Sequence, residues 1–234
     1  MICAVHQPNF LPYLGFFDKL YRCDVFVLYD TAQFVKREFH NRNRVIGTQG
    51  APQWLTVPVA ARFGQRIADV SIADDSQPFR DQHVRTLEYA YGHSPGASET
   101  IPAVAEAYAL HGTGSLVELN VDLLDRVVAL LGGGPRRVLA SELGVDPTLR
   151  STDALVAIVQ AVEADTYLSG AGGRGYLDED RVAAAGIDLA WQDFHHPVYP
   201  QRANGDFVPN LSIVDSLCEV GPKETAKLLT GTLS

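Results

Sequence analysis

This sequence has few cysteines, fewer basic than acidic residues, and no long apolar run. Its three cysteines, at positions 3, 23 and 218, form no CxxC pair and have no regular spacing, which excludes a disulfide framework. Its 19 Lys and Arg residues against 28 Asp and Glu residues give a net charge of −9. Because a nucleic-acid-binding protein needs excess basic charge to neutralise phosphates, we expect no nucleic-acid partner.

Signals for a membrane or for export are also missing. No stretch reaches the roughly 18 uninterrupted apolar residues of a transmembrane helix. The opening MICAVHQPNF lacks the basic segment and apolar run of a signal peptide. We therefore expect a cytoplasmic protein that does not bind a membrane. A content of 46% hydrophobic and 20% charged residues is ordinary for a globular chain.

Strand-like and helix-like segments alternate along the chain. Residues 2–5 and 25–30 are short apolar runs typical of buried strands, and the apolar residues between them have helical spacing. Residues 165–170 predict a later strand, whereas residues 79–150 are almost entirely helical in pattern. We predict an α/β fold with a Rossmann-like, mostly parallel sheet. It forms one domain over residues 1–234, with a helical insertion or subdomain at about 79–150.

Polar residues follow the first two predicted strands. His6 and Gln7 come directly after the first strand, and Asp30 ends the second. Ligands of open α/β sheets bind beyond the carboxyl ends of the strands, and histidine can act as an acid or a base near neutral pH. We predict that His6, Gln7 and Asp30 are catalytic, with Asp30 orienting an acceptor. The alternative is that His6 and Gln7 only satisfy backbone groups at a strand end.

A basic cluster follows Asp30. It contains Lys36, Arg37, Arg42 and Arg44, and Asn41 and Asn43 directly precede the last two arginines. Such residues suit an anionic ligand such as a phosphate or carboxylate, although a solvated basic loop is the alternative.

A glycine-rich stretch follows the strand at 165–170. Its glycines, at 170, 172, 173 and 175, fit neither GxGxxG nor a Walker A motif. The backbone N–H groups of this loop can approach a phosphate, but a plain turn remains open.

The remaining reactive residues give weaker signals. The adjacent His195 and His196 have no metal-ligand spacing, and Cys3 and Cys218 lie in apolar segments typical of a core. We therefore expect no metal, no cofactor and no cysteine nucleophile.

Several stretches resemble one family in its own order. They are HQPNFLPYLGFFDKLYRCDVFVLYD, QFVKREFHNRNRVIG, QWLTVPV, YLSGAGGRGYL, HPVYPQ and FVPNLSIVDSL. These look like WbqC-like proteins, which occur in bacterial O-antigen, capsule and natural-product gene clusters. With the motifs above, the resemblance implies substrate-binding roles for Asp18, Lys19, Lys36, Arg37, Asn41, Arg42, Trp54, Ser169, Gly170, Tyr176, His196, Tyr199 and Gln201.

The resemblance implies a transferase in polysaccharide or natural-product biosynthesis. We expect it to move an acyl, aminoacyl or related group, without a metal, from an activated donor to a small amine or hydroxyl acceptor. Its substrate is then a small molecule, either bound to a carrier protein or activated by a nucleotide. One alternative is a non-catalytic partner of a carrier protein or pathway enzyme.

Another alternative is a nucleotidylyltransferase-like enzyme of the HUP fold. This looser resemblance rests on the order of strand, Pro/Gly loop, helix and strand. The corresponding stretch LPYLGFF lacks both histidines of the HxGH motif that such enzymes use.

Overall fold

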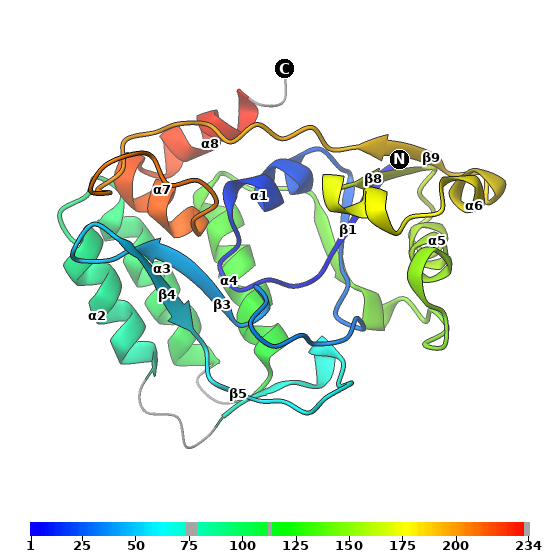
Figure 1. Cartoon of the computed structure of the whole chain (residues 1–234), viewed down its shortest axis with the longest axis horizontal. Coiled ribbons are helices and arrows are strands. Elements are labelled where there is room, and N and C mark those ends of the chain that lie inside the picture. Colours follow the sequence, from blue (N-terminus) through cyan, green and yellow to red (C-terminus); the bar gives the residue numbers. More distant parts are fainter. Residues whose placement is uncertain (74–78, 112–113, 232–234) are drawn as a thin grey trace.

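A parallel sheet of five strands forms the centre of the protein in a computed structural model that describes residues 1–73, 79–111 and 114–231 (Figure 1). Its strands are β1 (Ile2–His6), β2 (Val25–Leu28), β7 (Arg136–Leu139), β8 (Thr166–Ser169) and β9 (Asp188–Trp191). Their order is β7-β2-β1-β8-β9, and all four neighbouring pairs are parallel. The predicted Rossmann-like α/β fold is confirmed.

The strand order reverses between β1 and β8. From β1 the chain moves outward to β2 and β7, then returns past β1 to add β8 and β9 on the other side. In open sheets of this kind, the crevice beyond the carboxyl ends of the two central strands is the usual ligand site.

Both faces of the sheet are covered by helices. Along β1, Cys3 and Val5 pack toward α5 (Ser151–Ala161) and α6 (Glu179–Ala184), whereas Ala4 packs toward α1 (Leu14–Tyr21). This follows from the two-residue period of a strand. Figure 1 shows α5 and α6 on one side of β1 and α1 on the other.

The segment between β2 and β7 forms a second layer with its own apolar core. It contains the antiparallel pair β3 (Arg42–Ile46) and β4 (Pro52–Thr56), the pair β5 (Val59–Ala60) and β6 (Ser71–Ile72), and the 3₁₀ turn η1 (Ile67–Asp69). The helices α2 (Phe79–Tyr91), α3 (Ala97–Leu110) and α4 (Leu116–Leu130) follow.

The helical part ends before β7, because Arg136 already pairs with Val25 of the central sheet. The division of the chain into a domain and an insertion stays a prediction.

The chain after β9 crosses back over the molecule. Residues 192–211, here called the strap, contain no helix or strand and run over α1 to α7 (Ile213–Val220) and α8 (Pro222–Thr230) (Figure 1). Within the described residues, none of the helices combines the length and apolar composition needed to cross a bilayer.

Candidate functional site

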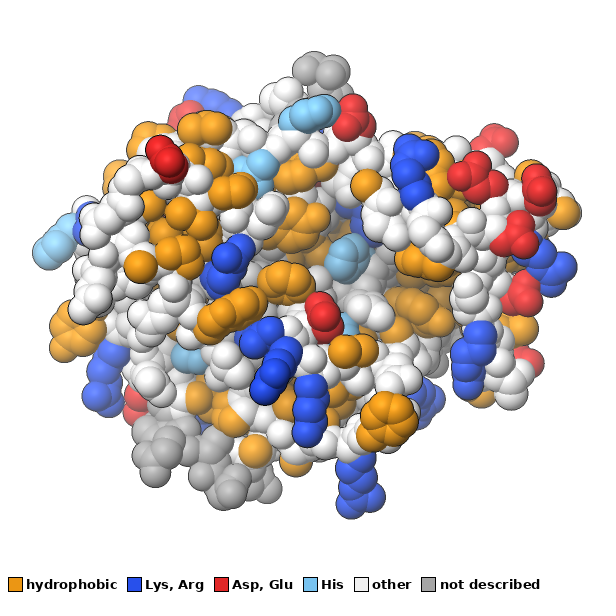
Figure 2. Space-filling model, in the orientation of Figure 1, with side chains coloured by type: hydrophobic (Ala, Val, Ile, Leu, Met, Phe, Trp, Pro, Cys, Tyr) orange, Lys and Arg blue, Asp and Glu red, His pale blue; other side chains and the backbone are white. Residues whose placement is uncertain are grey.

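A cavity of about 650 Å³ lies at the carboxyl ends of β1 and β8, where the strand order reverses. Its polar lining includes His6, Gln7, Lys19, Ser169, Gly170 and Gln192. Aromatic rings from Tyr13, Tyr29, Tyr176 and Phe194 line it as well. No Asp or Glu is among its lining residues, so Lys19 is its only charged group at neutral pH among the described residues. The face of the molecule in Figure 2 is hollowed near its centre.

Lys19 is a buried amine on α1. Its side chain is 4% exposed, and its Nζ donates a hydrogen bond to the Val5 carbonyl at 2.9 Å. The β1–β8 pairing ends at Ala4 and Leu168, so this carbonyl lies just beyond the last paired residue. No carboxylate pairs with Lys19 among the described residues, and burial lowers its pKa to about 8. Lys19 therefore changes its charge close to neutral pH.

His6 is the last residue of β1, and its ring packs edge-on against Phe16 with centroids 4.7 Å apart. Its Nδ1 lies 2.9 Å from the Gln7 carbonyl. Because a carbonyl only accepts, Nδ1 carries the proton and Nε2 keeps a free lone pair. Burial, and then the charge of Lys19, lower the pKa of His6 to about 3. The ring is therefore neutral at physiological pH.

Gln7 connects the cavity to the segment after β2. Its Oε1 lies 2.8 Å from His40 Nε2, while His40 Nδ1 accepts a bond from the Val35 N–H at 3.4 Å. These two contacts require the His40 tautomer that donates from Nε2 to Gln7. Burial lowers the pKa of His40 to about 4, which keeps this donor neutral. The sequence does not signal this pair, because its members lie 33 residues apart.

The β8 side of the cavity is built from small residues. Ser169 ends β8, and the glycine-rich stretch forms the 3₁₀ turn η3 (Ala171–Gly175). A Cβ atom on Gly170 would lie 3.7 Å from Gln192 Oε1 and 4.0 Å from Lys19 Nζ. Gly170 therefore leaves open the space directly in front of the buried amine.

Asp18 lies behind the cavity wall rather than in it. Its carboxylate pairs with Arg22 Nε at 3.0 Å and accepts a bond from Gln192 Nε2 at 2.6 Å. Gln192 Nε2 also donates to the Gly15 carbonyl at 2.8 Å. Asp18 thus positions Gln192, a cavity residue that the sequence analysis missed because its position depends on contacts with α1.

Asp30 does not line the cavity, although it follows β2. Its two carboxylate oxygens accept bonds from the Ser141 N–H at 3.0 Å and the Ser141 hydroxyl at 2.6 Å. The carboxylate therefore ties the end of β2 to the turn after β7.

The predicted basic cluster and Trp54 also lie outside the cavity lining. Arg42 begins β3, and its guanidinium stacks 4.2 Å from the ring centroid of Trp54 on β4. Asn41 is buried and donates to the Val57 carbonyl at 2.8 Å, which is a structural contact. Lys36 and Arg37 are exposed on the connection before β3.

The strap residues form a separate buried network. Tyr199 Oη and Gln201 Nε2 donate to Asp215 Oδ2 at 2.9 and 3.0 Å, and Tyr91 Oη donates to Asp215 Oδ1 at 2.6 Å. His196 donates from Nδ1 to the Pro197 carbonyl at 2.8 Å.

Of the residues predicted to bind substrate or act in catalysis, the cavity brings together His6, Gln7, Lys19, Ser169, Gly170 and Tyr176.

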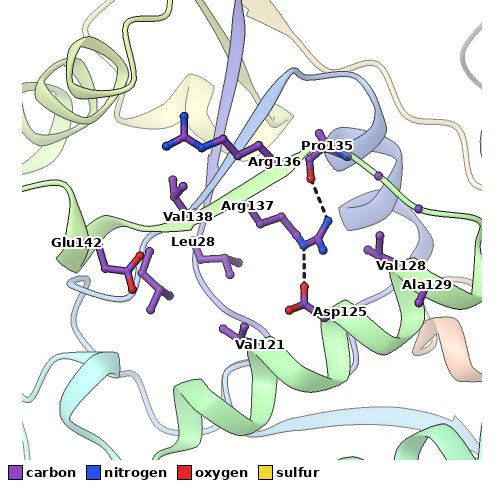
Figure 3. A pocket seen from close by; sticks show the side chains of 13 residues that line it. Leu28, Val121, Asp125, Val128, Ala129, Pro135, Arg136, Arg137, Val138 and Glu142 are labelled. Carbon is purple, nitrogen blue, oxygen red and sulfur yellow. Dashed lines mark hydrogen bonds and ion pairs between the residues drawn. The ribbon is translucent and has the colours of Figure 1, made fainter.

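A second cavity, of about 590 Å³, lies between β7 and α4 (Figure 3). Its apolar lining includes Leu28, Val121 and Val128. Arg137 pairs with Asp125 at 2.8 Å and donates to the Pro135 carbonyl at 2.9 Å, so its charge is already balanced. Across the described residues, no group of three or more His, Cys, Asp or Glu side chains is arranged to hold a metal ion.

The fold and the cavity together define a Rossmann-like α/β protein with a polar candidate site at its topological switch point. The chain belongs to the WbqC-like protein family, whose model matches residues 7–227. It is also 33% identical, over 220 residues that cover 93% of both chains, to the uncharacterised protein Rv1507c of Mycobacterium tuberculosis. No solved structure matches the chain.

Proposed function

We propose that this protein is a transferase whose active site is the cavity at the ends of β1 and β8. It moves an acyl, aminoacyl or related group from an activated, anionic donor to a small amine or hydroxyl acceptor. The resemblance to WbqC-like proteins supports a cytoplasmic role in natural-product or surface-polysaccharide biosynthesis. The observation that carries the proposal is the buried Lys19 ammonium in a cavity whose lining, among the described residues, contains no Asp or Glu.

A buried, unpaired ammonium is costly, because burial removes the charge from water. The bond to the Val5 carbonyl uses one of its three N–H donors, and the other two have no acceptor among the described residues. An anionic group in the space in front of Gly170 would accept those bonds and raise the pKa of Lys19 again. We therefore assign the donor's phosphate or carboxylate to this position.

His6 is suited to the acceptor side of the reaction. Its free Nε2 lone pair can accept a hydrogen bond from an amine or hydroxyl and hold that nucleophile in place. On attack, the nucleophile forms a bond to the transferred group, and the donor's leaving group departs with its electron pair. The nucleophile's proton passes to Nε2, whose pKa is raised by the negative charge of the bound donor.

Turnover by the purified chain tests this proposal. Acyl thioesters, acyl adenylates and sugar nucleotides are each incubated with amine and alcohol acceptors, and mass spectrometry detects the transferred group. We expect one donor class to react, and His6→Ala and Lys19→Met to lower kcat/KM at least 100-fold. Gly175→Ala is the matched control, because Gly175 is outside the cavity lining and a Cβ there meets nothing within 4 Å. Full turnover by both variants would exclude this site.

The dependence of kcat/KM on pH distinguishes the contribution of Lys19 from that of His6. Because Lys19 loses its proton near pH 8, kcat/KM is expected to fall about tenfold per pH unit above that value. Between pH 5 and 7 it is expected to stay flat, since His6 remains neutral there. A profile that instead rises through pH 6.5 would assign the chemistry to an ordinary histidine.

A further inference from the structure

A surface of apolar and basic side chains lies on the β2–β3 connection and the β3–β4 pair. We call it the Trp54 surface, and it consists of Val35, Lys36, Arg37, Phe39, Arg42 and Trp54. Three large apolar side chains are exposed on it, Val35 at 45%, Phe39 at 41% and Trp54 at 43%. Exposed apolar groups beside charged ones are typical of protein–protein contact sites.

The charge of this surface is not balanced locally. Arg42 and Arg44 lie 4.2 and 5.8 Å from the Trp54 ring centroid, and Phe39 lies 6.2 Å from it. None of the basic side chains from Lys36 to Arg44 forms an ion pair within the described residues, although Glu38 belongs to the same segment. In a chain of net charge −9, this surface is a local positive region, and Lys and Arg side chains gather on the hollowed face in Figure 2.

The Trp54 surface is joined to the cavity through His40, which follows Phe39 in the chain and contacts Gln7. The Phe39 carbonyl accepts a bond from the Phe10 N–H at 2.9 Å, and the next residue, His40, donates to Gln7 at 2.8 Å. Asn120 fixes the same turn by donating to the His40 carbonyl at 2.8 Å. A partner that contacts Phe39 is therefore one residue away from His40, which holds the cavity residue Gln7 in place.

We propose that the Trp54 surface docks an acidic carrier protein, which brings a covalently attached substrate to the cavity. The charges are complementary, and the exposed aromatic rings supply the apolar area that charged contacts alone lack. The net charge of −9 repels an acidic partner elsewhere on the chain, so the positive region sets the docking position. The delivery of substrate depends on the proposed transferase function, whereas docking does not.

Fluorescence anisotropy tests docking with one defined probe, a purified, dye-labelled acyl carrier protein of net negative charge. The variants are Trp54→Ala and the double charge reversal Lys36→Glu with Arg37→Glu. We expect the double variant to weaken binding more than tenfold and Trp54→Ala at least fivefold. Binding by the wild type should also weaken as salt is raised from about 0.05 to 0.3 M.

Two controls match these changes. Arg136→Glu with Lys223→Glu makes the same change in net charge at exposed positions on β7 and α8, and Phe63→Ala removes an exposed aromatic ring outside the surface. Both controls are expected to bind within twofold of the wild type. Equal weakening by the charge control, or wild-type binding by both surface variants, would overturn the proposal. So would a lack of binding by the wild type.

Other occupants give different results in the same assay. Preferential binding to anionic vesicles or to a single-stranded oligonucleotide, lost in the Trp54→Ala variant, would replace the carrier protein with a lipid or nucleic-acid partner. Lys19→Met is expected to bind the carrier protein without its attached substrate as tightly as the wild type does, because it changes only the cavity. Docking without turnover leaves this surface in place and removes the transferase, whereas turnover with unchanged binding by the surface variants removes the surface.

Discussion

At the scale of single residues, the pKa values of Lys19 and His6 both lie below those usual for their residue types. Histidine usually titrates near neutral pH and lysine well above it. Here burial holds His6 neutral, with a pKa of about 3, and lowers the pKa of Lys19 to about 8. The candidate site therefore has one lone-pair acceptor and one proton-bearing cation at pH 7.

The buried amine predicts a pH-dependent stability difference between the wild type and Lys19→Met. Its pKa falls from 10.5 in the unfolded chain to about 8 in the fold, so between these values the unfolded chain binds the proton that the fold has released. The wild-type free energy of unfolding should therefore rise, relative to the variant, by roughly 3 kcal/mol from pH 7 to 10.5. Urea unfolding of both proteins across this range measures it, and a constant difference would show that Lys19 is not desolvated.

Gly170 predicts a loss of binding without a loss of stability. Its φ of −72° and ψ of 158° suit any residue, and an added Cβ meets only ordinary contacts at 3.7 and 4.0 Å. Gly170→Val should therefore unfold within about 0.5 kcal/mol of the wild type. It should bind inorganic phosphate, as a probe of the Lys19 position, at least tenfold more weakly by calorimetry. Gly175→Val, in the same turn but outside the cavity lining, is the matched control. Equal phosphate affinities of the two variants would show that the anion does not bind next to Lys19.

At the scale of elements, the strap is held by one buried carboxylate. Asp215 on α7 receives bonds from Tyr91 on α2 and from Tyr199 and Gln201 on the strap. Burial raises its pKa, and the three donors partly oppose that rise. Tyr199 and Gln201, which were predicted to bind substrate, thus attach the strap through Asp215 to Tyr91 of the second layer.

This network predicts graded losses of stability. Tyr199→Phe removes one donor and leaves Asp215 with two others, so it should cost about 1 kcal/mol. Asp215→Ala leaves three buried donors without an acceptor and should cost about 3 kcal/mol or more. Urea denaturation measures both, with the exposed Asp193→Ala as the control. If Asp215→Ala were as stable as this control, the network would not hold the strap.

At the scale of the whole molecule, the order of the strands positions the cavity at the switch point of the sheet. The charge distribution makes this cavity selective for anions. A chain of net charge −9 repels anions generally, yet the described part of the chain lines its switch-point cavity with a cation and no carboxylate. An anion bound there contacts only the folded protein, because the unfolded chain does not assemble β1, β8 and α1. Binding energy at this site is therefore added to the stability of the whole fold.

Phosphate is accordingly expected to raise the melting temperature of the wild type. At 100 times its Kd the gain is about 2.7 kcal/mol, which corresponds to roughly 5–10 °C for a chain of this size. Lys19→Met should show less than a quarter of that gain at the same phosphate concentration. Differential scanning fluorimetry with matched chloride measures it, and an equal rise in both proteins would indicate a general salt effect.

The sequence by itself determined the sheet and the strand ends that form the cavity. Short apolar runs separated by helical patterns are local properties, and they predicted β1, β2 and β8 with His6, Gln7, Ser169 and Gly170 at the correct edge. Family membership was likewise predicted from contiguous motifs and is confirmed by the match over residues 7–227.

Only the tertiary structure decided which strand-end residues share the cavity. Asp30 carries the same sequence signal as His6, but Ser141, which lies 111 residues away, takes both of its oxygens. Lys36 and Arg37 follow the same strand, yet the β3–β4 pair places Arg42 and Trp54 on a separate surface. The burial of Lys19, and with it the low pKa, arises from packing between α1 and β1. These outcomes depend on contacts between distant segments, and no local pattern encodes them.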